Sequence, residues 1–83
     1  MNKRIKRFEE IIEAKQVEYD FADIKNFLEY YEFFARKPES SHFIFRRQSF
    51  LHNIIIVTHR NKVKRWYVKK AIEILKEHKI IEI

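Results

Sequence analysis

The sequence has no glycine, no cysteine and only one proline among its 83 residues. Without cysteine it forms neither disulfides nor thiolate metal sites, which fits a cytoplasmic protein. Without glycine it lacks the glycine-rich loops that hold nucleotide phosphates, and its turns must use asparagine, aspartate, serine, proline or strained residues. No run reaches the roughly 18 apolar residues of a membrane-spanning helix. No apolar segment of a signal peptide follows the basic start, so we expect neither a membrane segment nor a leader.

A chain of this length makes one small domain, which buries only about 60–65% of its unfolded surface. The core must therefore be dense. Eight phenylalanines, four tyrosines and one tryptophan supply the large apolar side chains for it.

The basic charge is concentrated in the middle of the chain. Residues 36–70 contain ten lysines and arginines against one glutamate, a net charge of +9, whereas residues 1–35 and 71–83 carry net charges of −2 and −1. Cations gathered in this way favour a polyanionic partner such as a nucleic acid. The alternative is a solvated basic surface with no ligand.

Three segments have apolar residues at helical spacing, and three have the alternating or β-branched residues of strands. The predicted helices are 3–15, 21–32 and 66–77, and the predicted strands are 33–37, 42–46 and 53–58. Asp20 suits the N-cap of the second helix, and Pro38 ends the first strand. Segment 16–19 is a connector or extended, 59–65 is a basic loop, and 79–83 is a terminal strand or a tail on the core. Strands joined by short turns predict an antiparallel three-stranded sheet with helices covering one face.

His42 opens the second predicted strand. Alternation puts His42, Ile44 and Arg46 on one face and two core phenylalanines on the other. His59 closes the third strand, which runs antiparallel to the second, so the two imidazoles can share one edge of the sheet. RNA cleavage without a metal needs a base, an acid and cations on the phosphate, and histidine suits both proton roles.

The predicted basic loop runs directly into the N-terminus of the last helix. Arg60, Lys62, Lys64 and Arg65 lie before or at this terminus, and Lys69 lies one turn on. Unpaired N–H groups and the helix dipole favour an anion there, so a phosphate backbone is the natural ligand.

A metal site is not expected. The sequence has no HExxH motif, and Glu39 is the one acidic residue in the basic half. We therefore expect no metal and no cofactor. His52 and His78 have no comparable context and are expected to be surface residues.

Segment Ser40–Arg46 resembles the Gly-Ser-His-x-x-aromatic motif of HicA-type toxins, the mRNA-cleaving halves of HicA–HicB toxin–antitoxin pairs. Segment Ile56–Lys70 is similar to their second signature, which is a strand ending in histidine, a basic loop and a helix that opens with an aromatic residue and valine. Segment Phe21–Phe34 is similar to their first helix and the turn that follows it. The resemblance covers residues 19–77. Ser40 stands where the family has glycine, and Lys64-Arg65 where it often has Lys-Pro.

The resemblance implies an α+β fold like the double-stranded RNA-binding domain, with the order α-β-β-β-α in residues 19–83 and a helical extension in residues 1–18. It also implies a metal-independent endoribonuclease that cleaves mRNA with His42 as the catalytic residue. The implied partner is a HicB-type antitoxin that covers this histidine, so that DNA is contacted only through the antitoxin.

The sequence hypothesis is thus an RNA-cleaving site with His42 as general acid or base and His59 as a second candidate. The predicted RNA-binding residues are Lys37, Arg46, Arg60, Lys62, Lys64, Arg65 and Lys69. The main alternative is a non-catalytic RNA-binding module. A more distant one is a domain that binds DNA or an acidic protein through its basic face.

Overall fold

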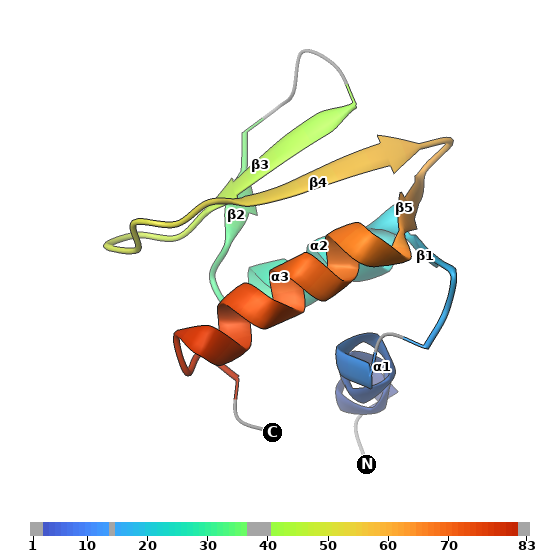
Figure 1. The fold of residues 1–83 in the computed structure, drawn as a ribbon, viewed down its shortest axis with the longest axis horizontal. Helices are drawn as coiled ribbons and strands as arrows, with labels where there is room; N and C mark the ends of the chain where they lie inside the picture. The colour runs from blue at the N-terminus through green and yellow to red at the C-terminus, as the bar shows by residue number, and fades with distance from the viewer. Residues whose placement is uncertain (1–2, 14, 37–40, 82–83) are drawn as a thin grey trace.

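The computed structural model describes residues 3–13, 15–36 and 41–81. Within these ranges the chain forms helices and an antiparallel sheet, so the fold is α+β (Figure 1). In chain order the elements are α1 (Lys3–Glu13), β1 (Glu18–Asp20), α2 (Phe21–Tyr30), β2 (Phe34–Ala35), β3 (His42–Arg46), β4 (Ile54–His59), β5 (Lys62–Lys64) and α3 (Arg65–Glu77).

The sheet has five strands in the order β1-β5-β4-β3-β2, and each neighbouring pair is antiparallel. The prediction of three strands was therefore wrong in number. The missed strands are β1 and β5, each of three residues with a single buried side chain, Tyr19 in β1 and Val63 in β5. A strand this short has no periodicity that a sequence pattern reveals. The two strands pair with each other, with Tyr19 opposite Val63, and β5 also pairs with β4.

The predicted basic loop is the β4–β5 hairpin. Its two-residue turn is made by Arg60 and Asn61, whose φ angles are 52° and 65°. Positive φ at both central residues is the type I′ geometry, which matches the twist of the flanking strands. Asparagine adopts this conformation readily. Arg60 adopts it at a steric cost, because its Cβ atom crowds the backbone at positive φ, and the sequence has no glycine that would avoid this cost.

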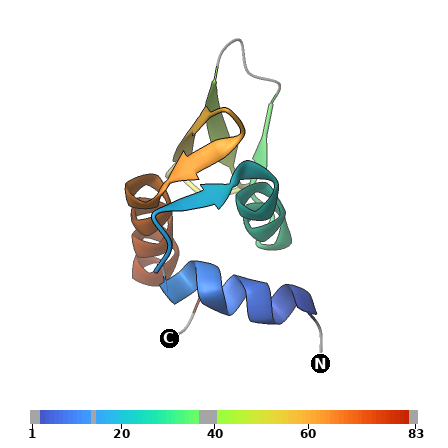
Figure 2. The same cartoon turned by 90° about the vertical axis from the view of Figure 1, so that its right-hand side faces the viewer.

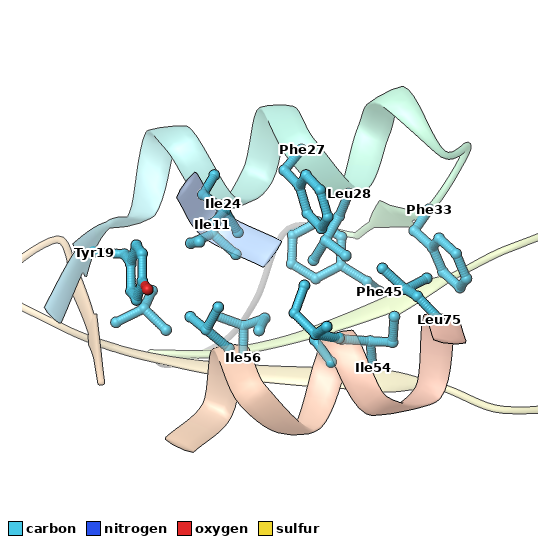
Figure 3. Packing of buried hydrophobic residues seen from close by; sticks show 14 of the residues in the cluster. Ile11, Tyr19, Ile24, Phe27, Leu28, Phe33, Phe45, Ile54, Ile56 and Leu75 are labelled. Atoms are coloured by element: carbon cyan, nitrogen blue, oxygen red, sulfur yellow. The ribbon is translucent and has the colours of Figure 1, made fainter. Parts of the chain in front are cut away.

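The core lies between one face of the sheet and helices α2 and α3. On β3 and β4 the side chains buried there include Phe45, Ile54 and Ile56 (Figure 3). The helices contribute Ile24, Phe27, Leu28, Val68, Ala71, Ile72 and Leu75. Helix α1 lies on the far side of α2 and α3 from the sheet (Figures 1 and 2). There Phe8 packs edge-on against Phe27, with ring centroids 5.0 Å apart.

The three helices and the two longer strands form where the sequence predicts them. The exception is the predicted strand 33–37, of which β2 keeps only Phe34–Ala35 and whose last residue, Lys37, lies outside the described residues together with Pro38. After α3 the chain turns and buries Ile81 in the core, so the described part of the C-terminal segment is a packed tail. Asp20 occupies the N-cap position of α2, but its side chain makes no capping hydrogen bond.

Both α2 and α3 end in a Schellman motif. After α2, the N–H groups of Glu32 and Phe33 donate to the carbonyls of Glu29 and Leu28. After α3, Lys79 and Ile80 donate in the same way to Lys76 and Leu75. The residue at the left-handed position of this motif is usually glycine, but here it is Glu32 with φ 68° and Lys79 with φ 57°.

Lys79→Gly should therefore stabilise the protein, by roughly 0.5–1 kcal/mol, because glycine adopts positive φ without the steric cost of a Cβ atom. Urea denaturation followed by circular dichroism measures the change. The matched control is Glu73→Gly on the exposed side of α3, which should destabilise by about 1 kcal/mol through lost helix propensity. Equal destabilisation by both substitutions would contradict the assignment of strain to Lys79.

Candidate nucleic-acid interface

The face of the sheet turned away from the helices carries most of the predicted site residues. We call it the open face. On each strand the exposed positions alternate with positions turned to the core, and the register aligns them across the sheet. Its residues are Glu18, Asp20, Phe34, His42, Ile44, Arg46, Ile55, Val57, His59, Lys62 and Lys64.

The two candidate histidines are diagonal neighbours on the open face. His42 lies opposite Val57 in the β3–β4 ladder, and His59 follows Val57 by two residues on β4. Directly opposite residues share a face, and so do residues two apart along a strand. Diagonal neighbours of this kind are about 7–8 Å apart, a separation at which two imidazoles can both reach one phosphodiester group. Both side chains are exposed.

An exposed apolar patch begins beside the histidines and extends to Arg46. Ile44 lies directly opposite Ile55, and Phe34 lies opposite Arg46. The exposed fractions are 57% for Phe34, 53% for Ile55 and 42% for Ile44. Exposed aromatic side chains on a sheet offer a stacking surface for nucleic-acid bases. The sequence signal for this patch was the alternation that put Ile44 on the face of His42, but it did not reveal that Phe34 joins them.

The two lysines of β5 face acidic partners on β1. The Nζ atom of Lys62 donates a hydrogen bond to Asp20 Oδ1, and Lys64 Nζ lies 3.5 Å from Glu18 Oε2. The hydrogen bond to Asp20, and then the negative charge of that carboxylate, raise the pKa of Lys62 above its ordinary value. Exposed ion pairs of this kind contribute little to stability, so a polyanion can compete for the lysines.

The start of α3 is less open to an anion than the sequence indicated. The N–H of Arg65 donates to the carbonyl of Val17 at 3.0 Å, so this helix-terminal donor is used within the fold. Lys69 is exposed on α3, in the helix layer behind the sheet, and Arg60 is exposed in the hairpin turn. The predicted set is thus divided. Arg46, Lys62 and Lys64 lie on the open face with the histidines, Arg60, Arg65 and Lys69 lie elsewhere, and Lys37 is outside the described residues.

A second histidine pair was not visible in the sequence. His52, in the loop before β4, and His78, at the C-cap of α3, have ring centroids 4.5 Å apart, and the ring of Phe50 packs edge-on against His78 at 5.0 Å. Both histidines are exposed, as expected of surface residues. Neither lies on a strand of the sheet, so neither belongs to the open face.

Among residues 3–13, 15–36 and 41–81, no group of three or more histidine, cysteine, aspartate or glutamate side chains is arranged to hold a metal ion. Over the same ranges, no helix combines the length and the apolar character needed to cross a membrane.

No family model, curated protein or solved structure matches the chain. Function is therefore inferred from the open face together with the two sequence signatures.

The contact between Lys62 and Asp20 can be tested through the pKa of Lys62. Asp20→Asn should lower the pKa of Lys62 toward its ordinary value of 10.5, because the substitution removes the negative charge of Asp20 and leaves only a neutral amide oxygen to accept the hydrogen bond. Asp23→Asn is the control and should lower it much less, since Asp23 acts only through a weaker charge interaction. NMR titration of the lysine side-chain carbons measures both changes. An equal or larger effect of Asp23→Asn would contradict the pairing.

Proposed function

We propose that this protein is a metal-independent endoribonuclease of the HicA toxin type, with its active site on the open face. One observation carries the proposal, namely that His42 and His59 are diagonal neighbours on one exposed face of the sheet. His42 begins β3 and His59 ends β4, and the side chains of both are exposed.

The step that cleaves the RNA strand needs two proton transfers and no other reagent. One imidazole takes the proton of the ribose 2′-hydroxyl, and the 2′-oxygen attacks the adjacent phosphorus. The bond from phosphorus to the 5′-oxygen breaks, and the second imidazole gives its proton to that leaving oxygen. The products are a 2′,3′-cyclic phosphate, which water opens to a 3′-phosphate, and a 5′-hydroxyl. His42 is one of the two groups, and His59 is the candidate for the other.

Cations on the same face support binding of the phosphate backbone. Arg46 lies on the strand of His42, and Lys62 lies directly opposite His59 in the hairpin. Lys62 and Lys64 exchange their carboxylate partners for phosphate oxygens when RNA binds. This exchange leaves Asp20 and Glu18 at the rim of the site, where they disfavour phosphates beyond the edge of the sheet.

The order of the central elements supports the likeness to the double-stranded RNA-binding domain. From α2 to α3 the chain runs α-β-β-β-α before the short strand β5 is counted, and both helices pack on one face of the sheet. In this proposal the protein is a cytoplasmic toxin, and its partner is a HicB-type antitoxin that covers His42. Any contact with DNA is made by that antitoxin.

Incubating purified protein with RNA in EDTA tests the proposal. We expect cleavage to persist in EDTA, and His42→Ala to reduce its rate by at least about 100-fold, the usual contribution of a general acid or base. His59→Ala should also slow cleavage. The matched control is His52→Ala, which should keep full activity because His52 lies outside the open face.

Two results would contradict the proposal of metal-independent ribonuclease activity. One is cleavage that EDTA abolishes, and the other is equal loss of activity in His52→Ala and His42→Ala. Binding of RNA by the wild type with no cleavage would favour the second candidate, a non-catalytic RNA-binding module. The exposed ring of Phe34, on the same face as the exposed Ile44 and Ile55, is the observation that favours this candidate, because an aromatic ring stacks on bases without any proton transfer.

A further inference from the structure

Strand β4 has a free edge. On one side β3 pairs with it from Ile54 to Val57. On the other side β5 pairs only with Thr58 and His59, because the chain leaves the sheet and begins α3 at Arg65. Within the described part of the chain, no strand pairs with the first four residues of β4 on the β5 side.

The backbone of Ile55 is turned toward this edge. The N–H of Thr58 donates to the carbonyl of Ser41 at 3.0 Å, so Thr58 directs its backbone groups toward β3. Backbone direction alternates along a strand, and His59 accordingly directs its groups toward β5. Ile55 lies four residues before His59 on β4, so its backbone groups point to the same side of the strand. Its N–H and C=O groups therefore point away from β3, where an added strand can bond to them.

A groove runs beside this edge, with α3 as its other wall. It has a volume of about 230 Å³ and is lined mainly by apolar side chains. Figure 1 shows α3 running alongside β4. The exposed Trp66 and Ile55 stand at the groove, with exposed fractions of 61% and 53%, and Lys70 supplies a cation. Backbone groups on one side and apolar side chains on the other are what an extended peptide needs for strand addition.

The charge of the chain argues for a partner other than a second copy. The net charge is +6, and two copies joined through their β4 edges would bring two Lys70 side chains toward one shared groove. An acidic segment meets no such repulsion. We propose that the groove between β4 and α3 binds an extended acidic segment of a partner protein, which adds as a strand to the free edge of β4. This proposal does not rest on ribonuclease activity.

Trp66 allows a direct test, because it is the only tryptophan in the chain. The probe is a seven-residue peptide of alternating glutamate and valine, titrated into the full-length protein while tryptophan emission is recorded. We expect a saturable change. The same peptide with methylated backbone nitrogens should bind at least about tenfold more weakly, because it has no N–H groups to donate to the carbonyls of β4 and its methyl groups crowd the strand edge.

Two surface variants and one further peptide test the site and its charge preference. Lys70→Glu should weaken binding of the acidic peptide, whereas the neighbouring Lys69→Glu should leave it nearly unchanged, because only Lys70 lines the groove. A lysine–valine peptide should bind less tightly than the glutamate–valine peptide. Peptide binding should also slow hydrogen exchange at the amide of Ile55.

Three outcomes would overturn the proposal. They are the absence of any change in Trp66 emission, equal binding of the methylated peptide, and self-association of the wild type that Ile55→Lys abolishes. The last would assign the edge to a second copy of this chain.

Discussion

The register of β3 against β4 is the constraint on which the rest of the structure depends. Phe45 pairs with Ile54 and Phe43 with Ile56, and Phe45, Ile54 and Ile56 are fully buried beneath the helices. Burying one such side chain stabilises the fold by about 1.5–3 kcal/mol, so a slip of one residue, which would turn either Phe45 of β3 or Ile54 and Ile56 of β4 to solvent, is strongly disfavoured. The same register puts His42 and His59 together on the opposite face. Packing of the core thus positions the candidate catalytic groups, although neither histidine takes part in that packing.

The short strand β5 links the two surfaces proposed for binding. It ends at Lys64 because α3 begins at the next residue, and in the described part of the chain this leaves the first four residues of β4 with no pairing strand on the β5 side. It also brings its two lysines against the carboxylates of β1, which offset part of the charge that the middle of the chain carries. The positive character of the open face is consequently strongest away from β1, toward Arg46, and the free edge of β4 lies beside a different set of cations on α3. RNA and a partner strand are therefore proposed for two surfaces that meet at Ile55.

The sequence predicts the elements whose side chains repeat with a clear period. Such patterns predict helices α2 and α3 and strands β3 and β4. Alternation alone predicts that His42 and Arg46 lie on one face of β3 and Phe45 on the other. Strands β1 and β5 were missed because three residues contain no period, and they form through pairing with neighbouring strands, β1 with β5 and β5 with β4. The contacts of Lys62 with Asp20 and of His52 with His78 were missed for a related reason. They join residues far apart in the chain, and only the folded backbone brings them together.

Mapping RNA contacts onto the backbone tests most directly whether the open face is the site. The measurement is a two-dimensional amide NMR spectrum of the protein with an RNA oligonucleotide whose 2′-hydroxyls are methylated, so that it binds but has no nucleophile. The account predicts that the amide signals of His42, Ile44, Val57 and His59 shift on binding. Shifts confined to the exposed side of α3 around Lys69, with these four signals unmoved, would contradict it.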